Sequence, residues 1–168
     1  KEFNNKSFKG FEFNSKKIKK NYIFFAIKGN KFNGNNFIND AIKKGASVVV
    51  SNKFKTGIKK KIIYIKVDDA RSALSNFATK YYYRKPKNVI AVTGTNGKSS
   101  IANFYHQILK LNKKKVASIG TLGVKSNSIN SKLENTTVDA ITINKLLSSL
   151  KNKKIENVIL EASSHGLK

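Results

Sequence analysis

Residues 89–104 read Val-Ile-Ala-Val-Thr-Gly-Thr-Asn-Gly-Lys-Ser-Ser-Ile-Ala-Asn-Phe: an apolar run, a turn bracketed by two glycines, and the start of a helical pattern. This strand–loop–helix arrangement is typical of a site for a nucleoside triphosphate, because glycines let backbone N–H groups approach phosphate oxygens closely. Lys98 can place a positive charge against the terminal phosphates, and the hydroxyl of Ser99 can ligate Mg²⁺. We therefore expect phosphate chemistry at this loop, strengthened by the positive N-terminal end of the following helix.

The spacing of the loop departs from the commonest phosphate-loop pattern, G-x-x-x-x-G-K-[ST]. Val92 stands where that pattern has its first glycine, and Gly94 instead lies three residues before Gly97. A Gly-Lys-Ser tripeptide is often only a turn, so a helix-opening loop without a ligand is the alternative. The position between a buried type of strand and an amphipathic helix favours the phosphate site.

Length and composition limit the class of protein. The chain has 168 residues, 39% of them hydrophobic, which suffices for one domain or two small ones. No apolar run approaches the roughly 20 residues of a membrane span, and no secretory h-region stands near the start, so we expect a cytoplasmic protein. The absence of Cys excludes disulfides and thiolate metal sites. Because the chain starts without Met and stops after a polar motif, we interpret it as a fragment of a longer protein.

The net charge of +25 comes from 34 basic and 9 acidic residues. Such a balance can indicate a polyanionic partner such as nucleic acid. The basic residues are mostly scattered lysines in short runs such as 59–61 and 113–115, without interleaved aromatic residues, and Asn is abundant. This pattern favours ordinary solvated surfaces, and we expect no nucleic-acid partner.

Strand and helix patterns alternate along the chain, which indicates an α/β fold with largely parallel strands. The expected strands cover residues 22–27, 47–51, 62–67, 89–92, 116–119 and 157–161, and the expected helices cover 36–44, 69–83, 98–111 and 139–151. Gly45 fits the position just after a helix, and residues 120–135 read as a Gly- and Ser-rich loop. In the helix over 98–111 we expect His106 at the surface and an inward face made of Ile101, Phe104, Tyr105, Ile108 and Leu111.

The segment 83–88 is the expected domain boundary, since it is polar and contains the only proline, Pro86. Residues 1–86 would form a small α/β domain. Residues 87–168 would form the first half of a mostly parallel, doubly wound domain of the phosphate-loop type. Phosphate sites in such sheets lie at the carboxyl ends of strands. Gly94 and Glu161 both lie at such ends, so we expect Glu161 close to the Mg²⁺ held by Ser99.

Two polar segments can each be interpreted either as functional or as purely structural. Residues 161–166, Glu-Ala-Ser-Ser-His-Gly, can supply a magnesium ligand in Glu161, or only cap a following helix through Ser163 or Ser164. His165 fits a hydrogen-bonding slot better than a phosphate contact. Residues 134–137, Glu-Asn-Thr-Thr, can bind a sugar, a carboxylate or a phosphate, although capping near Asp139 explains part of that cluster.

Three motifs in order resemble the Mur ligase family of peptidoglycan synthesis. Residues 93–99 are similar to the family's T-G-T-N-G-K-T, with Ser for the last Thr; residues 135–137 match its N-T-T; and residues 161–165 are similar to its E-V-S-S-H. Upstream, residues 13–16 look like its D-S-R segment, and residues 28–46 parallel its G…D-G…F-I…A…G-A pattern. The resemblance runs from about residue 10 to the end of the chain, and the three downstream motifs are the specific part.

The resemblance implies a uridine-nucleotide domain followed by an ATPase domain. It implies an ATP-dependent amide-bond ligase that phosphorylates the D-glutamate side chain of UDP-N-acetylmuramoyl-L-alanyl-D-glutamate and adds a diamino acid as the third residue. It implies ATP contacts at Gly94, Thr95, Asn96, Gly97, Lys98, Ser99 and Ser100, with Lys98 catalytic and Mg²⁺ on Ser99 and Glu161. It implies substrate contacts at Phe13, Ser15, Asn30, Lys31, Phe32, Asn135, Thr136, Thr137 and Ser163. We expect a monomer, with the family's carbamylated lysine and third domain beyond Lys168.

Asn14, Lys16 and Asn33 depart from the family's Asp, Arg and Asp, which bears on the nucleotide-sugar contacts more than on the ATP site. These residues do not decide whether the diamino acid is meso-diaminopimelate or L-lysine. Other Mur ligases and folate polyglutamate ligases resemble the phosphate loop without the other two motifs. A GTP-hydrolysing switch would need an N-K-x-D motif, which these residues lack, and a basic nucleic-acid-binding module is the non-enzyme alternative.

Overall fold

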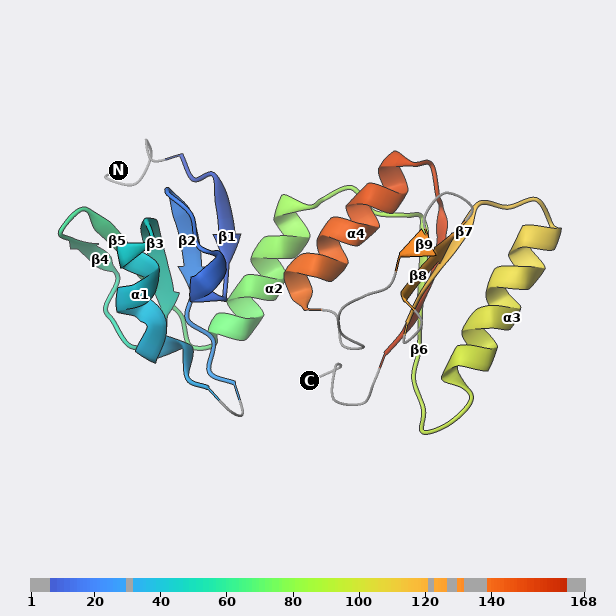
Figure 1. Cartoon of the computed structure of the whole chain (residues 1–168), viewed down its shortest axis with the longest axis horizontal. Helices are drawn as coiled ribbons and strands as arrows, with labels where there is room; N and C mark the ends of the chain where they lie inside the picture. The colour runs from blue at the N-terminus through green and yellow to red at the C-terminus, as the bar shows by residue number, and fades with distance from the viewer. Residues whose placement is uncertain (1–6, 30–31, 121–122, 127–129, 132–138, 163–168) are drawn as a thin grey trace. The chain divides into compact units, whose positions relative to one another are not determined.

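The computed structural model describes residues 7–29, 32–120, 123–126, 130–131 and 139–162. The chain divides into two compact units, residues 1–77 and 78–168, each with its own sheet (Figure 1). The division falls inside a helix, whereas the sequence predicts a domain boundary after Pro86; that boundary stays a prediction. No helix in these described ranges is long and apolar enough to cross a membrane.

The first unit is built on a mostly parallel sheet in the order β1-β2-β3-β5-β4. Its strands are β1 (Gly10–Glu12), β2 (Tyr22–Phe25), β3 (Ala46–Ser51), β4 (Gly57–Lys59) and β5 (Ile62–Lys66), and only β4 pairs antiparallel. Its helices are the short 3-10 turns η1 (Ser15–Lys17) and η2 (Gly34–Phe37), then α1 (Ile38–Lys43) and α2 (Ala70–Tyr81), which passes into the second unit. The strand–helix alternation predicted from the sequence is confirmed, and β1 and β4 are strands that it missed.

Adjacent residues of β2 point to opposite faces of this sheet and meet different helices. Phe24 is fully buried in the cluster that contains Ile38 and Ala41 of α1. Phe25 faces the other way, where its ring lies 5.7 Å from that of Phe77 in α2. Both faces of the sheet are therefore covered, which explains why β2 reads as a continuous apolar run.

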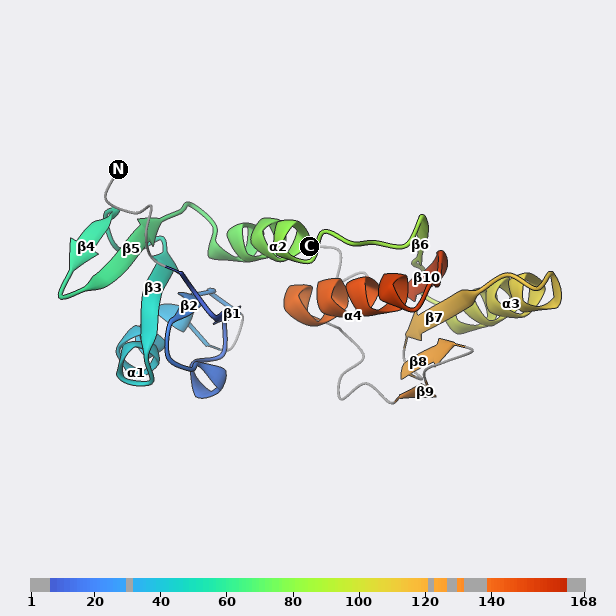
Figure 2. The ribbon, with the colours of Figure 1, turned by 90° about the horizontal axis from the view of Figure 1, so that it is seen from above.

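The second unit has a sheet in the order β6-β10-β7-β8-β9. Its elements are β6 (Asn88–Val92), α3 (Lys98–Leu111), β7 (Val116–Gly120), β8 (Gly123–Ser126), β9 (Asn130–Ser131), α4 (Ala140–Asn152) and β10 (Asn157–Glu161). Strands β6, β10 and β7 are parallel, and α3 and α4 lie on opposite sides of them in both views (Figures 1 and 2). This is the expected doubly wound arrangement.

The expected loop over residues 120–135 is wrong in part, because it contains two antiparallel strands. β8 pairs with β7 from Gly120↔Gly123 to Ala117↔Ser126, and β9 pairs with β8. Val124 is buried against Ala117 and Ile119 in the core under α4. The glycine and serine content of this segment concealed a strand whose packing comes from a neighbour.

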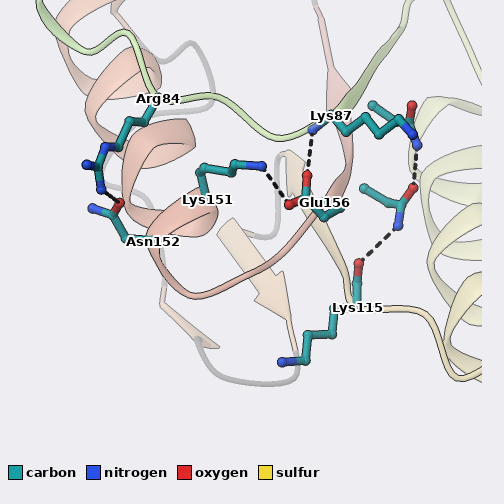
Figure 3. Close-up of polar contacts among 8 residues, drawn as sticks. Arg84, Lys87, Lys115, Lys151, Asn152 and Glu156 are labelled. Atoms are coloured by element: carbon teal, nitrogen blue, oxygen red, sulfur yellow. Dashed lines mark hydrogen bonds and ion pairs between the residues drawn. The ribbon is translucent and has the colours of Figure 1, made fainter.

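Polar side chains join the amino ends of the parallel strands (Figure 3). Glu156 accepts from Lys151 Nζ at 2.6 Å and from the Lys87 backbone N–H at 3.0 Å, and these contacts, led by the one from Lys151, lower its pKa. Asn88 donates to Asn157 at 2.8 Å, and the Asn157 amide donates to the backbone carbonyl that precedes β7 at 3.2 Å. Because these contacts lie at the starts of the strands, the carboxyl ends are left for chemistry.

The buried face of α3 differs from the predicted one. Ala102 and His106 are buried at 2% and 3% exposure, so the surface position expected for His106 is wrong. Of the residues expected inward, Tyr105 is half-buried, but the structure leaves the others exposed: Ile101, Phe104, Ile108 and Leu111. Periodicity shows which residues share a face of a helix, but it does not show which face packs against the sheet. Here the face that packs against the sheet is the one that carries Ala102 and His106.

The ends of the helices follow the predicted signals. Asp139 caps α4 by accepting from the backbone N–H groups of Ile141 and Thr142 at 2.9 and 3.0 Å. Gly45 follows α1 with φ 107° and donates to the carbonyl of Ile42 at 2.9 Å, as expected for a glycine just past a helix. These local signals therefore place the helices correctly even where the buried face is not predicted.

Candidate phosphate and magnesium site

The loop between β6 and α3 has the backbone shape of an anion site. Gly94 has φ 150° and Gly97 has φ 80°, conformations that residues with a side chain rarely adopt. Gly97 is the N-cap of α3 and, having no side chain, leaves the first backbone N–H groups of that helix without a side-chain cap. Such N–H groups, with the helix dipole behind them, attract phosphate oxygens.

Lys98 lies against this loop. Its amino group donates to the carbonyl of Gly94 at 2.5 Å and to that of Thr95 at 3.2 Å. Its positive charge is thus held over the loop rather than extended into solvent. A phosphate bound to the loop would offer this ammonium group a charged acceptor in place of two neutral ones.

Ser99 and Glu161 meet across the end of the sheet. The hydroxyl of Ser99 donates to Oε2 of Glu161 at 2.8 Å. The contact follows from the parallel pairing of β10 with β6, in which Glu161 stands opposite Val92, and from the backbone N–H of Ala162, which donates to the carbonyl of Val92 at 2.9 Å. The expected proximity of the two side chains is therefore present in the structure.

The Ser99–Glu161 pair fits Mg²⁺. A serine hydroxyl and one carboxylate are hard oxygen ligands, and Mg²⁺ commonly takes one or two such protein ligands and completes its shell with water and phosphate. Among the residues that the structure describes, no group of three or more His, Cys, Asp or Glu side chains could hold a metal ion. The pair suits a nucleotide-bound ion better than a cage built wholly of protein ligands.

The predicted substrate contacts differ in their surroundings: two are exposed, one is buried, and the others lie outside the described residues. Phe13, after β1, and Phe32, in the loop after β2, are exposed at 37% and 71%. Ser15 is buried, and a hydrogen bond from its hydroxyl, followed by Lys44, lowers the pKa of the Asp40 carboxyl. The remaining predicted substrate contacts lie outside the described residues: Asn30, Lys31, Asn135, Thr136, Thr137 and Ser163.

One polar network at the carboxyl end of β3 was missed by sequence reasoning. Ser51, 1% exposed, donates to Oδ1 of Asn35 at 2.7 Å, and Asn35 donates to Oδ1 of Asn52 at 3.1 Å. The contacts tie the turn η2 to the end of β3. A serine directly after a run of buried valines was the signal that could have indicated it.

Comparison with known proteins agrees with both units. Residues 7–82 match the catalytic domain of the Mur ligase family, and residues 92–168 match the Mur ligase middle domain. A UDP-N-acetylmuramoyl-L-alanyl-D-glutamate–2,6-diaminopimelate ligase from Rickettsia montanensis is 46% identical over 163 residues, covering 95% of this chain and 34% of that protein. The ligase of the same name from Mesorhizobium japonicum is 37% identical over 158 residues, covering 94% of this chain and 33% of its own.

Solved structures show the same likeness. The structure of a UDP-N-acetylmuramoyl-L-alanyl-D-glutamate–2,6-diaminopimelate ligase superposes with a TM-score of 0.76 at 28% identity, covering 95% of this chain and 33% of that one. The MurF ligase from Thermotoga maritima in complex with ADP superposes with a TM-score of 0.56 at 25% identity, covering 92% and 32%.

The parallel sheet and its glycine-bracketed loop have the fold of a phosphate-loop domain, and a small α/β domain precedes it in the chain. The order of the two matched domains gives the family: the chain belongs to the Mur ligases. It spans about a third of the length of the curated relatives it matches.

Proposed function

We propose that this chain supplies the nucleotide-sugar and ATP sites of an ATP-dependent ligase that adds 2,6-diaminopimelate to UDP-N-acetylmuramoyl-L-alanyl-D-glutamate. The observation that carries the proposal is the hydrogen bond from Ser99 to Glu161, 2.8 Å, beside a glycine-bracketed loop at the N-terminus of α3. The relatives that carry this activity in their names support the substrate and the choice of diaminopimelate over L-lysine.

Each residue of the loop has a physical role in this proposal. The backbone N–H groups of residues 94–97 and of the first turn of α3 bind the phosphates, and Lys98 turns from the carbonyl of Gly94 to the terminal phosphate. Ser99 and Glu161 would hold Mg²⁺, and the ion would supply positive charge to neutralise the phosphates. Positioning and charge stabilisation are what phosphoryl transfer to a substrate carboxylate requires of a protein.

The substrate contacts complete the proposal. Phe13, Ser15 and the segment 30–32 would bind the uridine nucleotide in the first unit. Residues 135–137 and Ser163 would contact the muramoyl dipeptide. The exposed rings of Phe13 and Phe32 support the first assignment, since exposed aromatic rings can stack on a base. We propose a monomer that acts in the cytoplasm, with no nucleic-acid partner.

Replacement of Lys98 tests the proposal in the full-length protein. We expect Lys98→Ala to lower the rate of ADP release dependent on UDP-muramoyl dipeptide and diaminopimelate by about 10²–10³-fold, the loss typical of a single charge-stabilising donor. Lys110→Ala, an exposed lysine in the last turn of the same helix, serves as the matched control and should retain the parent rate. Equal rates for both variants would remove Lys98 from the mechanism, and a parent protein that prefers GTP or L-lysine would contradict the assigned substrates.

A further inference from the structure

Glu161 and Gly120 end neighbouring parallel strands and face the same side of the sheet. The pairing of β10 with β7 runs to Leu160↔Ile119, so Glu161 and Gly120 are the next residues of the two strands. Leu160 and Ile119 pack into the core under α4. Because side chains alternate along a strand, Glu161 and Gly120 are on the opposite face of the sheet. Figure 1 shows α3 on the side of the strands opposite to α4.

The space beside the Gly120 backbone is taken by the carboxylate of Glu161. A methyl group at position 120 would stand 2.6 Å from Cγ of Glu161 and closer still to its Cδ and Oε1. The backbone itself does not require glycine here: among the described glycines, those with positive φ are Gly45, Gly94, Gly97 and Gly123. What excludes a side chain at position 120 is therefore the position of the Glu161 carboxylate.

The two oxygens of that carboxylate are held differently. Oε2 accepts from Ser99 at 2.8 Å, while Oε1 lies over the bare backbone of Gly120. The atoms that a methyl group would displace, Cγ, Cδ and Oε1, all belong to the flexible side chain of Glu161 and none to the backbone, so the strand can keep its path while that side chain turns away. A substitution at position 120 should thus move Glu161 off Ser99 without breaking β7.

We propose that Gly120 is a positioning residue for the magnesium site. Because position 120 has no side chain, the Glu161 carboxylate can occupy the space beside it and stay within reach of Ser99 and of the ion. This inference rests on the proposed function, because it presumes that Ser99 and Glu161 bind Mg²⁺ with ATP. It adds a residue that does not touch the metal, and it explains why β7 ends in glycine. Residues that orient metal ligands commonly change metal affinity about 10–100-fold when replaced.

The experiment measures ATP affinity by calorimetry in the full-length protein, once with Mg²⁺ and once with EDTA. For Gly120→Ala we expect the gain in affinity produced by Mg²⁺ to fall at least about tenfold, with the affinity in EDTA within about twofold of the parent. Gly57→Ala is the matched control, since a methyl group at position 57 meets no atom within 4 Å and should change neither value. An unchanged Mg²⁺ gain in Gly120→Ala would overturn the inference.

A double variant separates positioning from a merely structural role. In Glu161→Ala the carboxylate is gone, so adding Gly120→Ala should leave the Mg²⁺ gain where Glu161→Ala alone puts it. A further loss in the double variant would overturn the inference. If Gly120→Ala fails to fold, the double variant Gly120→Ala/Glu161→Ala must fold, because the overlap between the new methyl group and the Glu161 side chain is gone. Failure of both variants to fold would also overturn the inference.

The parent protein distinguishes the two proposals. If the parent binds ATP more tightly with Mg²⁺ and Gly120→Ala does the same, only the role of Gly120 is lost. If the parent binds no ATP under either condition, the proposed function fails and the inference about Gly120 fails with it.

Discussion

The amino group of Lys98 donates to the carbonyl of Gly94 at 2.5 Å, so the side chain of this first residue of α3 folds back onto the loop that precedes the helix. It also reaches the carbonyl of Thr95 at 3.2 Å. Both acceptors belong to an exposed loop that water also reaches. The contacts therefore hold the charge in place but contribute little to the stability of the domain.

The first prediction separates folding from phosphate binding at Lys98. We expect Lys98→Ala to change the free energy of unfolding by less than about 1 kcal/mol, as is usual for a surface hydrogen bond. Urea unfolding followed by circular dichroism measures this value. A larger loss would mean that Lys98 supports the fold, and the loss of activity proposed for this variant would then need a structural explanation.

The second prediction concerns His106, which is buried at 3% exposure and whose Nε2 has no hydrogen-bond partner among the described residues. Burial lowers its pKa from 6.5, and the charges of Lys125 and Lys110 lower it further. The unfolded chain therefore binds a proton more readily than the folded chain. The contribution of His106 to stability is complete above about pH 7 and is lost as the pH falls from 6.5 toward the folded pKa.

Replacement by an aromatic residue of similar size tests this dependence. We expect His106→Phe to be as stable as the parent at pH 7.5, since it removes an unpaired polar atom, and to lose less stability than the parent between pH 7 and pH 5.5. Urea midpoints over this range measure the slope. Parallel slopes for the two proteins would show that His106 does not titrate on unfolding.

The third prediction tests which face of α3 is buried. Ala102 is 2% exposed and Ile108 is 57% exposed. We expect Ala102→Leu to destabilise this chain by about 1–3 kcal/mol through overpacking against the sheet, and Ile108→Ala to cost less than about 0.5 kcal/mol. Denaturant unfolding of the two variants gives both values. A larger loss for Ile108→Ala than for Ala102→Leu would mean that the buried face of α3 is the one that the sequence alone predicts.

The fourth prediction concerns the lysines that follow the two long helices of the second unit. Lys113 and Lys154 have φ 57° and 60°, and each follows a helix closed by the two backbone hydrogen bonds of a Schellman motif, a position that favours glycine. We expect Lys113→Gly and Lys154→Gly each to raise the unfolding free energy by about 0.5–1 kcal/mol.

A helical lysine supplies the control for that exchange. Lys110 lies in the last turn of α3 and has no positive φ, so glycine should instead lower the unfolding free energy there, by up to about 1 kcal/mol. Opposite signs at Lys110 and Lys113, measured by thermal unfolding, would assign the gain to backbone conformation. A loss at all three positions would show that the lysine side chains themselves stabilise the helix ends.

Local signals along the chain were sufficient for much of the fold. The start of α3 at Lys98, the cap at Asp139 and the glycine after α1 follow from rules that involve only a few neighbouring residues. The strand β8 was missed because its burial comes from β7 and α4 rather than from its own composition.

The sequence alone determined that a strand, a glycine-bracketed loop and a helix beginning at Lys98 follow one another, because backbone freedom and helix-start signals are local properties. Only the tertiary structure decided that β10 lies between β6 and β7, which brings Glu161 to Ser99 and leaves Gly120 as its bare neighbour. It also decided that α3 meets the sheet through Ala102 and His106. Strand order and helix faces depend on contacts between residues far apart in the chain, where packing rather than local conformation selects the arrangement.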